Sequence, residues 1–165
     1  MGRDILFIER NLSFLKPGGR MAVVLPQGRF NNSSDKALRE YLAAHCRILA
    51  VIGLHGNVFK PHTGTKTSVL LVQKWNDDPK VGSLCPRVDD YPIFFATMKE
   101  PSKDNSGDKI YRSGLDGSPL LDEHDHLVVQ HDLFSQELKD GHRTPDGIAE
   151  AFEEFAKKEG FGFFP

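Results

Sequence analysis

The sequence is poor in cysteine and has no long apolar run, and both shortages exclude classes of protein. Its two cysteines, Cys46 and Cys85, lie far apart in the 165-residue chain, so neither a disulfide framework nor a cysteine-based zinc site is expected. No apolar run approaches the ~18 residues that a membrane-spanning helix needs, and the first residues lead into a charged segment. We therefore expect a cytoplasmic protein with no membrane partner.

The sequence also lacks a glycine-rich loop between a strand and a helix, which is the arrangement that holds nucleotide-like cofactors. Gly18 and Gly19 come before an apolar run, whereas Gly53 and Gly56 follow one but lead into a polar stretch. No cofactor-binding residue is assigned for this reason.

Metal-binding motifs are missing as well. The segment His124-Asp125-His126, with His131 beyond it, has no cysteine nearby and matches no standard spacing of metal ligands. No metal ligand is assigned.

The composition is that of a soluble globular chain, with 39% hydrophobic and 27% charged residues, enough for one core. The net charge of −2 conceals a division between the two halves. Residues 1–75 hold 11 Lys and Arg against 4 Asp and Glu, a net +7, whereas residues 76–165 hold 10 against 19, a net −9. If the partner is a nucleic acid, the first half is the one expected to face it.

The hydrophobic pattern predicts alternating helices and strands. A helix is expected over 4–15, because its apolar residues recur at helical spacing and a Pro-Gly-Gly segment follows. The continuous apolar run 21–25 predicts a strand buried on both faces. Further strands are predicted over 48–52 and 68–73, which can be antiparallel neighbours because no helix separates them.

Between these strands, residues 32–35 offer side chains that can cap a second helix, expected to end near His45. Residues 91–96 predict an edge strand, and the short alternating runs within 109–129 indicate peripheral β-hairpins. A final helix is predicted to begin at Thr144-Pro145-Asp146 and is followed by an apolar tail.

Two stretches carry a resemblance to a known family. The first runs from Leu6 to Pro26 and includes Lys16-Pro17-Gly18-Gly19-Arg20 before the apolar run, with Asn31, Asn32 and Arg39 beyond it. The second is Phe59-Lys60-Pro61-His62-Thr63-Gly64-Thr65-Lys66-Thr67-Ser68. In this order and spacing they resemble the C-terminal part of the catalytic domain of the modification (M) subunit of type I restriction-modification systems, which are adenine-N6 DNA methyltransferases.

The resemblance implies an α/β fold, namely an incomplete Rossmann-like methyltransferase sheet. The chain would supply the closing strands, including an antiparallel hairpin pair, together with a peripheral β-hairpin and a C-terminal helix. The expected organisation is the second half of the methyltransferase domain over 1–98, a hairpin- and loop-rich extension over 99–143, and the C-terminal helix and apolar tail over 144–165.

The same resemblance limits the chemistry expected of this chain. The family binds S-adenosylmethionine on a glycine-rich loop and polarises the adenine amino group with an Asn- or Asp-Pro-Pro-aromatic motif, and the sequence has no Pro-Pro pair. The donor is therefore expected in the complete enzyme and not on this chain alone. No catalytic residue is assigned, and no activity is expected without the rest of the enzyme.

The resemblance also implies a site in the second stretch. Phe59 would stack on the flipped adenine, and a hydroxyl-rich basic loop would contact DNA phosphates. The expected phosphate contacts are Lys60, His62, Thr63, Thr65, Lys66 and Thr67. The alternative is that Phe59 anchors the core and the remainder is a solvated turn.

The partners implied are DNA, the remaining N-terminal part of the methyltransferase, and the specificity and restriction subunits of the complex. An alternative function is a non-enzymatic DNA- or subunit-binding module on the same scaffold. A complete small-molecule methyltransferase is disfavoured because the donor loop is missing.

Overall fold

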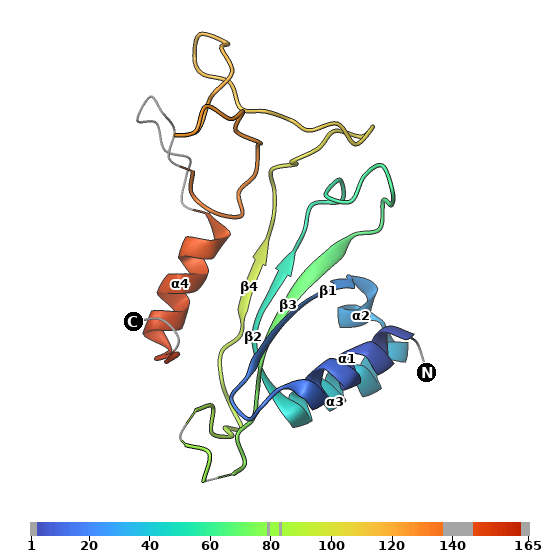
Figure 1. Cartoon of the computed structure of the whole chain (residues 1–165). Helices are drawn as coiled ribbons and strands as arrows, with labels where there is room; N and C mark the ends of the chain where they lie inside the picture. Colours follow the sequence, from blue (N-terminus) through green and yellow to red (C-terminus); the bar gives the residue numbers. More distant parts are fainter. Residues whose placement is uncertain (1–2, 79, 83, 137–146, 163–165) are drawn as a thin grey trace. The chain divides into compact units, whose positions relative to one another are not determined.

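The computed structural model describes residues 3–78, 80–82, 84–136 and 147–162 (Figure 1). The chain divides into two compact units. The first comprises residues 1–52 and 67–95, and the second comprises residues 53–66 and 96–165. The segment between the second and third strands therefore belongs to the second unit, although the strands on either side of it belong mainly to the first.

Four strands form one sheet in the order β1-β3-β2-β4. Their bounds are Arg20–Pro26 for β1, Cys46–Gly53 for β2, Thr67–Lys74 for β3 and Phe94–Thr97 for β4. β1 pairs with β3 in antiparallel register from Arg20 opposite Gln73 to Pro26 opposite Thr67. The expected neighbours β2 and β3 are adjacent, and the expected edge strand is β4, at one end of the order.

The helices complete the expected α/β class. They are α1 (Arg3–Phe14), α2 (Gly28–Asn31), the 3-10 helix η1 (Ser33–Asp35), α3 (Lys36–His45) and α4 (Ile148–Lys158). The first predicted helix and the predicted end at His45 are confirmed. Among the described residues, no helix is long and apolar enough to cross a membrane.

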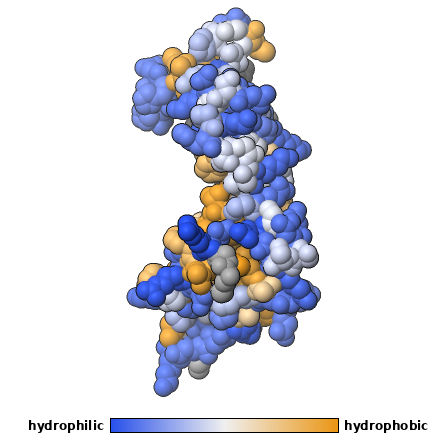
Figure 2. All heavy atoms as spheres, turned by 90° about the vertical axis from the view of Figure 1, so that its right-hand side faces the viewer, coloured by the Kyte–Doolittle hydropathy of each residue, from blue (hydrophilic) through white to orange (hydrophobic). Residues whose placement is uncertain are grey.

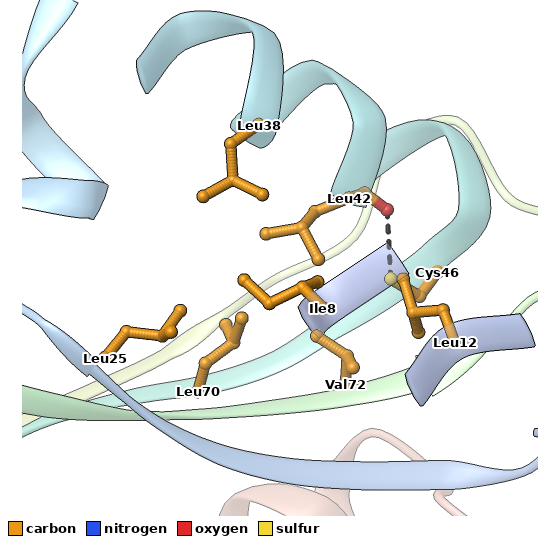
Figure 3. Close-up of a cluster of buried hydrophobic side chains, with 8 residues drawn as sticks. All are labelled: Ile8, Leu12, Leu25, Leu38, Leu42, Cys46, Leu70 and Val72. Carbon is orange, nitrogen blue, oxygen red and sulfur yellow. Dashed lines mark hydrogen bonds between the residues drawn. The ribbon is translucent and has the colours of Figure 1, made fainter. Parts of the chain in front are cut away.

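The core of the first unit lies where α1 and α3 cover one face of the sheet. Figure 3 shows apolar side chains from both helices pointing toward those of the strands. The cluster consists of Ile8, Leu12, Leu25, Leu38, Leu42, Cys46, Leu70 and Val72. Cys46 is fully buried and its thiol donates a 3.0 Å hydrogen bond to the Leu42 carbonyl. Burial raises the pKa of this thiol to about 12, so Cys46 is an unreactive packing residue.

The connection from α1 to β1 is built around a glycine bulge. Gly18 has a φ of +72°. Its N–H donates to the Lys74 carbonyl at 3.0 Å, and the Lys74 N–H donates to the Gly19 carbonyl at 2.8 Å. Two residues thus oppose one, with glycine in the left-handed region at the first position, which is the pattern of a G1 bulge. A Cβ at position 18 would lie 2.9 Å from the Leu84 Cβ, so this site requires glycine for a second reason.

The predicted capping role of residues 32–35 is wrong. Neither η1 nor α3 has a side-chain capping hydrogen bond at its N-terminus. Asp35, whose side chain is 6% exposed, instead forms an ion pair with Arg29 at 2.9 Å. Arg29 also contacts Asp4 at 2.7 Å. The Asp35 carboxylate accepts one N–H of the Arg29 guanidinium, whose other two donors bind Asp4, and a hydrogen bond from a charged donor is stronger than the neutral one that a helix cap offers.

The prediction that residues 21–25 are buried on both faces is also wrong for this chain. Leu25 belongs to the core, with Met21 and Val23 packed against it, but Ala22 and Val24 on the other face are exposed. The continuous apolar pattern identified the strand correctly and overstated its burial here.

In the second unit, the predicted hairpins appear as isolated antiparallel bridges rather than long strands. Three backbone hydrogen bonds close a ring: the Arg112 N–H donates to the Val128 carbonyl, Leu120 to Arg112, and Val128 to Leu120, at 2.9, 3.0 and 3.0 Å. The turns between these positions are headed by Asp116 and Asp122, whose carboxylates accept backbone N–H groups. Hydrogen bonding to the charged form lowers the pKa of both carboxyl groups.

Helix α4 also belongs to the second unit. Its backbone begins with hydrogen bonds from the Ile148 and Ala149 N–H groups to the Asp132 and Leu133 carbonyls, at 3.0 and 2.8 Å. The predicted start at residues 144–146 lies outside the described residues. Phe161, which belongs to the apolar tail, is buried, and the rest of that tail beyond residue 162 also lies outside the described residues.

Candidate functional site

The segment between β2 and β3, residues 53–66, contains most of the predicted site. It folds as a succession of turns, because the N–H groups of Val58, Lys60 and Thr63 donate to carbonyls three or four residues back. The Asn57 N–H also donates to the His55 ring nitrogen at 3.2 Å. We refer to residues 53–66 as the site loop.

A turn over residues 102–110 holds the site loop in place by four hydrogen bonds, the weakest of them from the Asn57 side-chain amide to Asn105 Oδ1 at 3.4 Å. Asn57 donates through its side-chain amide to the Lys103 carbonyl at 3.0 Å. Lys103 donates in the opposite direction, from Nζ to the Lys60 carbonyl at 2.8 Å. Lys60 Nζ in turn donates to the Asn105 carbonyl at 3.3 Å. The two segments therefore exchange donors and acceptors in both directions, and we call residues 102–110 the supporting turn.

The supporting turn is itself organised by one carboxylate. Asp104 Oδ1 accepts the N–H groups of Ser106, Gly107 and Asp108 at 2.8, 2.8 and 3.0 Å. These backbone hydrogen bonds lower the pKa of Asp104, so the carboxylate keeps its charge to a lower pH than an ordinary aspartate does. A carboxylate that accepts several backbone N–H groups fixes the turn without help from the loop that it supports.

Gly107 of the supporting turn packs against Pro61 of the site loop. Gly107 has a φ of +101°, and a Cβ there would lie 2.6 Å from both the Pro61 ring nitrogen and its Cδ. Any side chain would push the Pro61 ring away, since 2.6 Å is well inside van der Waals contact. Gly107 is therefore a packing requirement of the site loop.

The structure brings together all of the predicted site residues except Thr67. Phe59 is exposed (39%) rather than buried, and Lys60 is half-buried beside the supporting turn. The exposed members are His62, Thr63, Thr65 and Lys66. Thr63 and Thr65 share a 3.0 Å hydrogen bond between their hydroxyls. Thr67 begins β3 and belongs to the first unit, opposite Pro26.

Sequence reasoning missed the residues that fasten this loop. The sequence analysis assigns no role to Asn57, Lys103, Asn105 or Gly107. The only available signal was the Asp-Asn-Ser-Gly turn sequence, which predicts a turn but not what lies against it.

The described residues do not fit the methyl donor. The site loop leads to β3 rather than to a helix, so the glycines after β2 have no helix N-terminus beyond them. β1 is followed directly by α2 with Gly28 at its start, an arrangement the sequence analysis had missed. This helix has four residues, and a Cβ at Gly28 would lie 2.9 Å from the Asn32 amide nitrogen, so the space at the glycine is filled by the chain's own side chain.

No three or more His, Cys, Asp or Glu side chains in the described part of the chain are grouped to hold a metal ion. Asp122 interacts with His126, and Glu123 interacts with His124, in pairs on an exposed turn.

Comparison with known proteins gives the family. Residues 1–111 match the N-6 DNA Methylase family, which is more than half of the chain and includes both the site loop and the supporting turn. The chain belongs to the N-6 DNA Methylase family. The resemblance seen in the sequence is confirmed, and the α/β class with an open sheet agrees with an incomplete Rossmann-like methyltransferase fold.

Individual relatives cover only part of this member of the N-6 DNA Methylase family. The methylase subunit of the type I restriction enzyme EcoEI from Escherichia coli is 34% identical over 70 residues, which are 42% of this chain and 14% of that subunit. A solved structure described as a putative class I S-adenosylmethionine-dependent methyltransferase from Listeria monocytogenes is 23% identical with a TM-score of 0.46. The match covers 57% of this chain and 26% of the Listeria protein.

Proposed function

We propose that the chain forms the closing part of the catalytic domain of an adenine-N6 DNA methyltransferase of the type I modification-subunit kind. Its role is to supply one wall of the pocket for the flipped adenine and a loop that contacts DNA. The remaining N-terminal part of the enzyme supplies the donor site for S-adenosylmethionine and the groups that polarise the adenine amino group. Specificity and restriction subunits are the further partners.

The observation that carries this proposal is that the Phe59 ring is exposed on a loop that the supporting turn fixes by hydrogen bonds. Membership of the N-6 DNA Methylase family supports the reaction class. A flipped base needs an aromatic surface that is both accessible and fixed. If the ring is mobile, part of the stacking free energy is offset by the entropy lost when the ring becomes ordered. Phe59 is 39% exposed, and the next residue accepts the Lys103 hydrogen bond through its carbonyl.

The surroundings of Phe59 support DNA as the substrate. His62 and Lys66 place basic groups on the exposed side of the site loop, and Thr63 and Thr65 place hydroxyls beside them. Such groups contact phosphates without reading sequence. Lys60 takes part in holding the loop, so we assign it a weaker share of phosphate binding than Lys66.

The test is methylation of adenine in duplex DNA by the chain combined with the donor-binding part of the enzyme. Base stacking on an aromatic ring contributes about 1–3 kcal/mol, so Phe59→Ala should lower methylation roughly ten- to one-hundred-fold. Phe59→Tyr should keep most of the activity. The matched control is Phe95→Ala, which removes a ring that is 69% exposed on β4, outside the site loop.

Three further measurements separate the alternatives. Titration of the isolated chain with S-adenosylmethionine should show no saturable binding, and binding with the affinity of a complete enzyme would contradict the division of roles. DNA binding by the combined proteins without any methylation would favour the non-enzymatic DNA- or subunit-binding module. A core role for Phe59 would appear as a loss of thermal stability in Phe59→Ala of the size seen for buried phenylalanines, about 3–5 kcal/mol.

A further inference from the structure

Two lysines of the supporting turn lie directly opposite each other. Lys103 and Lys109 are antiparallel partners, and the residues on either side of them are joined by backbone hydrogen bonds of 3.0 and 2.9 Å. The pair is therefore of the non-hydrogen-bonded kind, in which opposite side chains lie closest, with Cβ atoms about 4.5–5.5 Å apart. Both lysine side chains project from the same face of the turn.

This arrangement costs stability, because like charges directly opposite each other repel. The ammonium group of Lys103 has a structural use, since its Nζ donates to the Lys60 carbonyl at 2.8 Å. Lys109 is exposed, and its side chain forms no hydrogen bond or ion pair with any residue that the structure describes. A residue that breaks a local rule without a structural gain indicates a functional position.

A third lysine reaches the same turn from the site loop. Lys60 Nζ donates to the Asn105 carbonyl at 3.3 Å, and its Cε lies 3.8 Å from the position of a Cβ built at Gly64. The Lys60 side chain therefore lies between its own loop and the supporting turn. We refer to Lys60, Lys103 and Lys109 as the lysine cluster.

The lysine cluster is not neutralised by ion pairs. The site loop contains no Asp or Glu, and within the described residues none of the three lysines forms an ion pair. Asp104 of the supporting turn uses its Oδ1 to accept three N–H groups of its own turn. Asp108 neighbours Lys109 along the chain, and alternation directs these two side chains to opposite faces. Each ammonium group has three donors, of which the cluster uses at most one.

The lysine cluster is accessible to a ligand. Lys109 is exposed, and Lys60 and Lys103 are half-buried. In Figure 1 the site loop and the supporting turn project toward the same side. Figure 2 views the molecule from that side, and its upper part is coloured mainly as hydrophilic. A group of ammonium donors on such a surface is suited to an anion.

We propose that the lysine cluster binds a phosphate group of the DNA backbone. The inference rests on the proposed function, because it identifies the part of the DNA substrate that the supporting turn holds. A phosphate offers oxygens to ammonium groups from both segments at once, and its negative charge offsets the repulsion between Lys103 and Lys109. The contact surface for DNA then extends into residues 76–165, although that half of the chain has a net charge of −9.

The first measurement is the salt dependence of binding of a short DNA duplex to the full chain. Lys109→Gln should weaken binding roughly five- to tenfold near 0.1 M salt and flatten the slope of log affinity against log salt by about one unit, as expected for one lost phosphate contact. Lys109→Arg keeps the charge and should bind nearly as the unaltered chain does.

The matched control is Lys158→Gln, which removes the charge of an exposed lysine on α4 in the same unit and should leave the slope unchanged. Equal losses of affinity in Lys109→Gln and Lys158→Gln overturn the inference, because they would show attraction to the unit as a whole. Absence of duplex binding by the unaltered chain also overturns it.

A double variant tests whether the lysines share one phosphate. If they do, losing either lysine loses the contact, so Lys60→Gln combined with Lys109→Gln should bind only slightly more weakly than Lys109→Gln alone. Losses of affinity that multiply, with a slope that falls by about two units, would assign the lysines to separate phosphates and overturn the shared site.

The stability of the free chain separates DNA binding from a structural role. Lys109→Gln should raise the midpoint of urea denaturation at low salt, because it removes the repulsion from Lys103. A lowered midpoint together with weaker duplex binding would show that Lys109 acts through the fold, and this result overturns the inference.

Inorganic phosphate is the probe that distinguishes DNA from a small phosphate compound. Inorganic phosphate should compete only weakly with the duplex, because it offers one of the several phosphates that DNA presents. Saturable binding of inorganic phosphate that Lys109→Gln abolishes, with duplex affinity unchanged in that variant, would identify a small phosphate compound as the ligand and overturn the proposal.

These outcomes are separate from those of the proposed function. Phe59→Ala should keep the salt slope of the unaltered chain, since stacking on a base involves no phosphate. Weaker methylation by Phe59→Ala, with unchanged duplex binding by Lys109→Gln, would contradict the phosphate site alone. The expected loss of duplex binding in Lys109→Gln, with full methylation by Phe59→Ala, would contradict the proposed function alone.

Discussion

The Nζ of Lys103 donates a 2.8 Å hydrogen bond to the carbonyl of Lys60, the residue directly after Phe59. The two residues are far apart in the sequence. Through their contact, the supporting turn holds the site loop in place. The position of the aromatic ring therefore depends on a segment that carries no predicted site residue.

The first prediction is that Lys103→Met loosens the site loop without unfolding the chain. Loss of a hydrogen bond from a charged donor costs about 1.5–3 kcal/mol when it is buried, and Lys103 is only half-buried, so we expect about 1 kcal/mol. Hydrogen exchange should quicken at the amides of Lys60 and Thr63, which close turns of the loop. Lys109→Met is the control, since Lys109 lies opposite Lys103 in the supporting turn and is exposed. Equal effects from both variants would contradict the role of Lys103.

The second prediction concerns the bulge that starts β1. Gly18→Ala should destabilise the chain by roughly 1–3 kcal/mol in urea denaturation, because φ is +72° and Leu84 blocks the space for a Cβ. Gly117→Ala separates the two causes, since its φ is +81° but nothing lies within 4 Å of the added Cβ. We expect the larger loss at Gly18. Similar losses at the two sites would show that the Leu84 contact relaxes freely.

The elements of the fold were predictable from the sequence to the extent that their signals are local. The spacing of Ile8 and Leu12 identified α1, and the apolar run after Arg20 identified β1. The prediction that failed was the burial of β1 on both faces. The apolar pattern of β1 indicates that Val24 is suited to an interior, but it does not indicate whether the segment that would cover it lies in this chain. The same limit applies to Phe161, whose burial depends on a second unit that no local pattern describes.

The site was predictable only in part, for a related reason. The loop from Phe59 to Lys66 was found only because its sequence resembles that of the type I modification subunits, since its residue types alone also suit a solvated turn. The contacts of this loop with Lys103 and Gly107 were not predicted, because contacts between distant loops produce no periodic pattern of hydrophobic residues in the sequence. Asp35 shows the opposite error, in which a strong local signal for a helix cap gave way to an ion pair with Arg29.

The third prediction is a loss of stability of the second unit in mild acid. The Leu133 N–H donates to His131 Nδ1 at 3.3 Å, which requires that nitrogen to be unprotonated. Burial and the nearby Arg112 lower the pKa of His131 below its ordinary 6.5, against the opposing effects of Asp132 and Glu100. The folded state then binds fewer protons than the unfolded state below pH 6.5, so the stabilisation is complete above that pH and is lost as the pH falls.

Urea denaturation at a series of pH values checks this prediction. His131→Asn should remove the decline that begins below pH 6.5, because an amide oxygen can accept the same N–H and does not titrate. His124→Asn, on an exposed turn, should leave the decline in place. Carboxyl groups with lowered pKa values, such as Asp104 and Glu150, add to the loss of stability only at lower pH, because their ordinary pKa values are 3.8 and 4.5. A decline that persists in His131→Asn would assign it to another group.

The fourth prediction tests whether the site loop contacts phosphates. Lys66 is exposed on the loop, and its side chain is not part of the hydrogen bonds to the supporting turn, so Lys66→Glu should change charge without loosening the loop. One phosphate contact contributes about 0.9 to the slope of log affinity against log salt, which corresponds to roughly five- to tenfold in affinity near 0.1 M salt. We therefore expect Lys66→Glu to weaken binding of a short DNA duplex by at least that factor and to flatten the salt dependence by about one unit. Lys36→Glu is the control, because it reverses a charge that is 74% exposed on α3 and is not part of the site loop. The decisive comparison is the slope of log affinity against log salt in the two variants. If both variants lose affinity equally and keep parallel slopes, the DNA is attracted to the basic half of the chain as a whole. The site loop would then not be part of the contact surface.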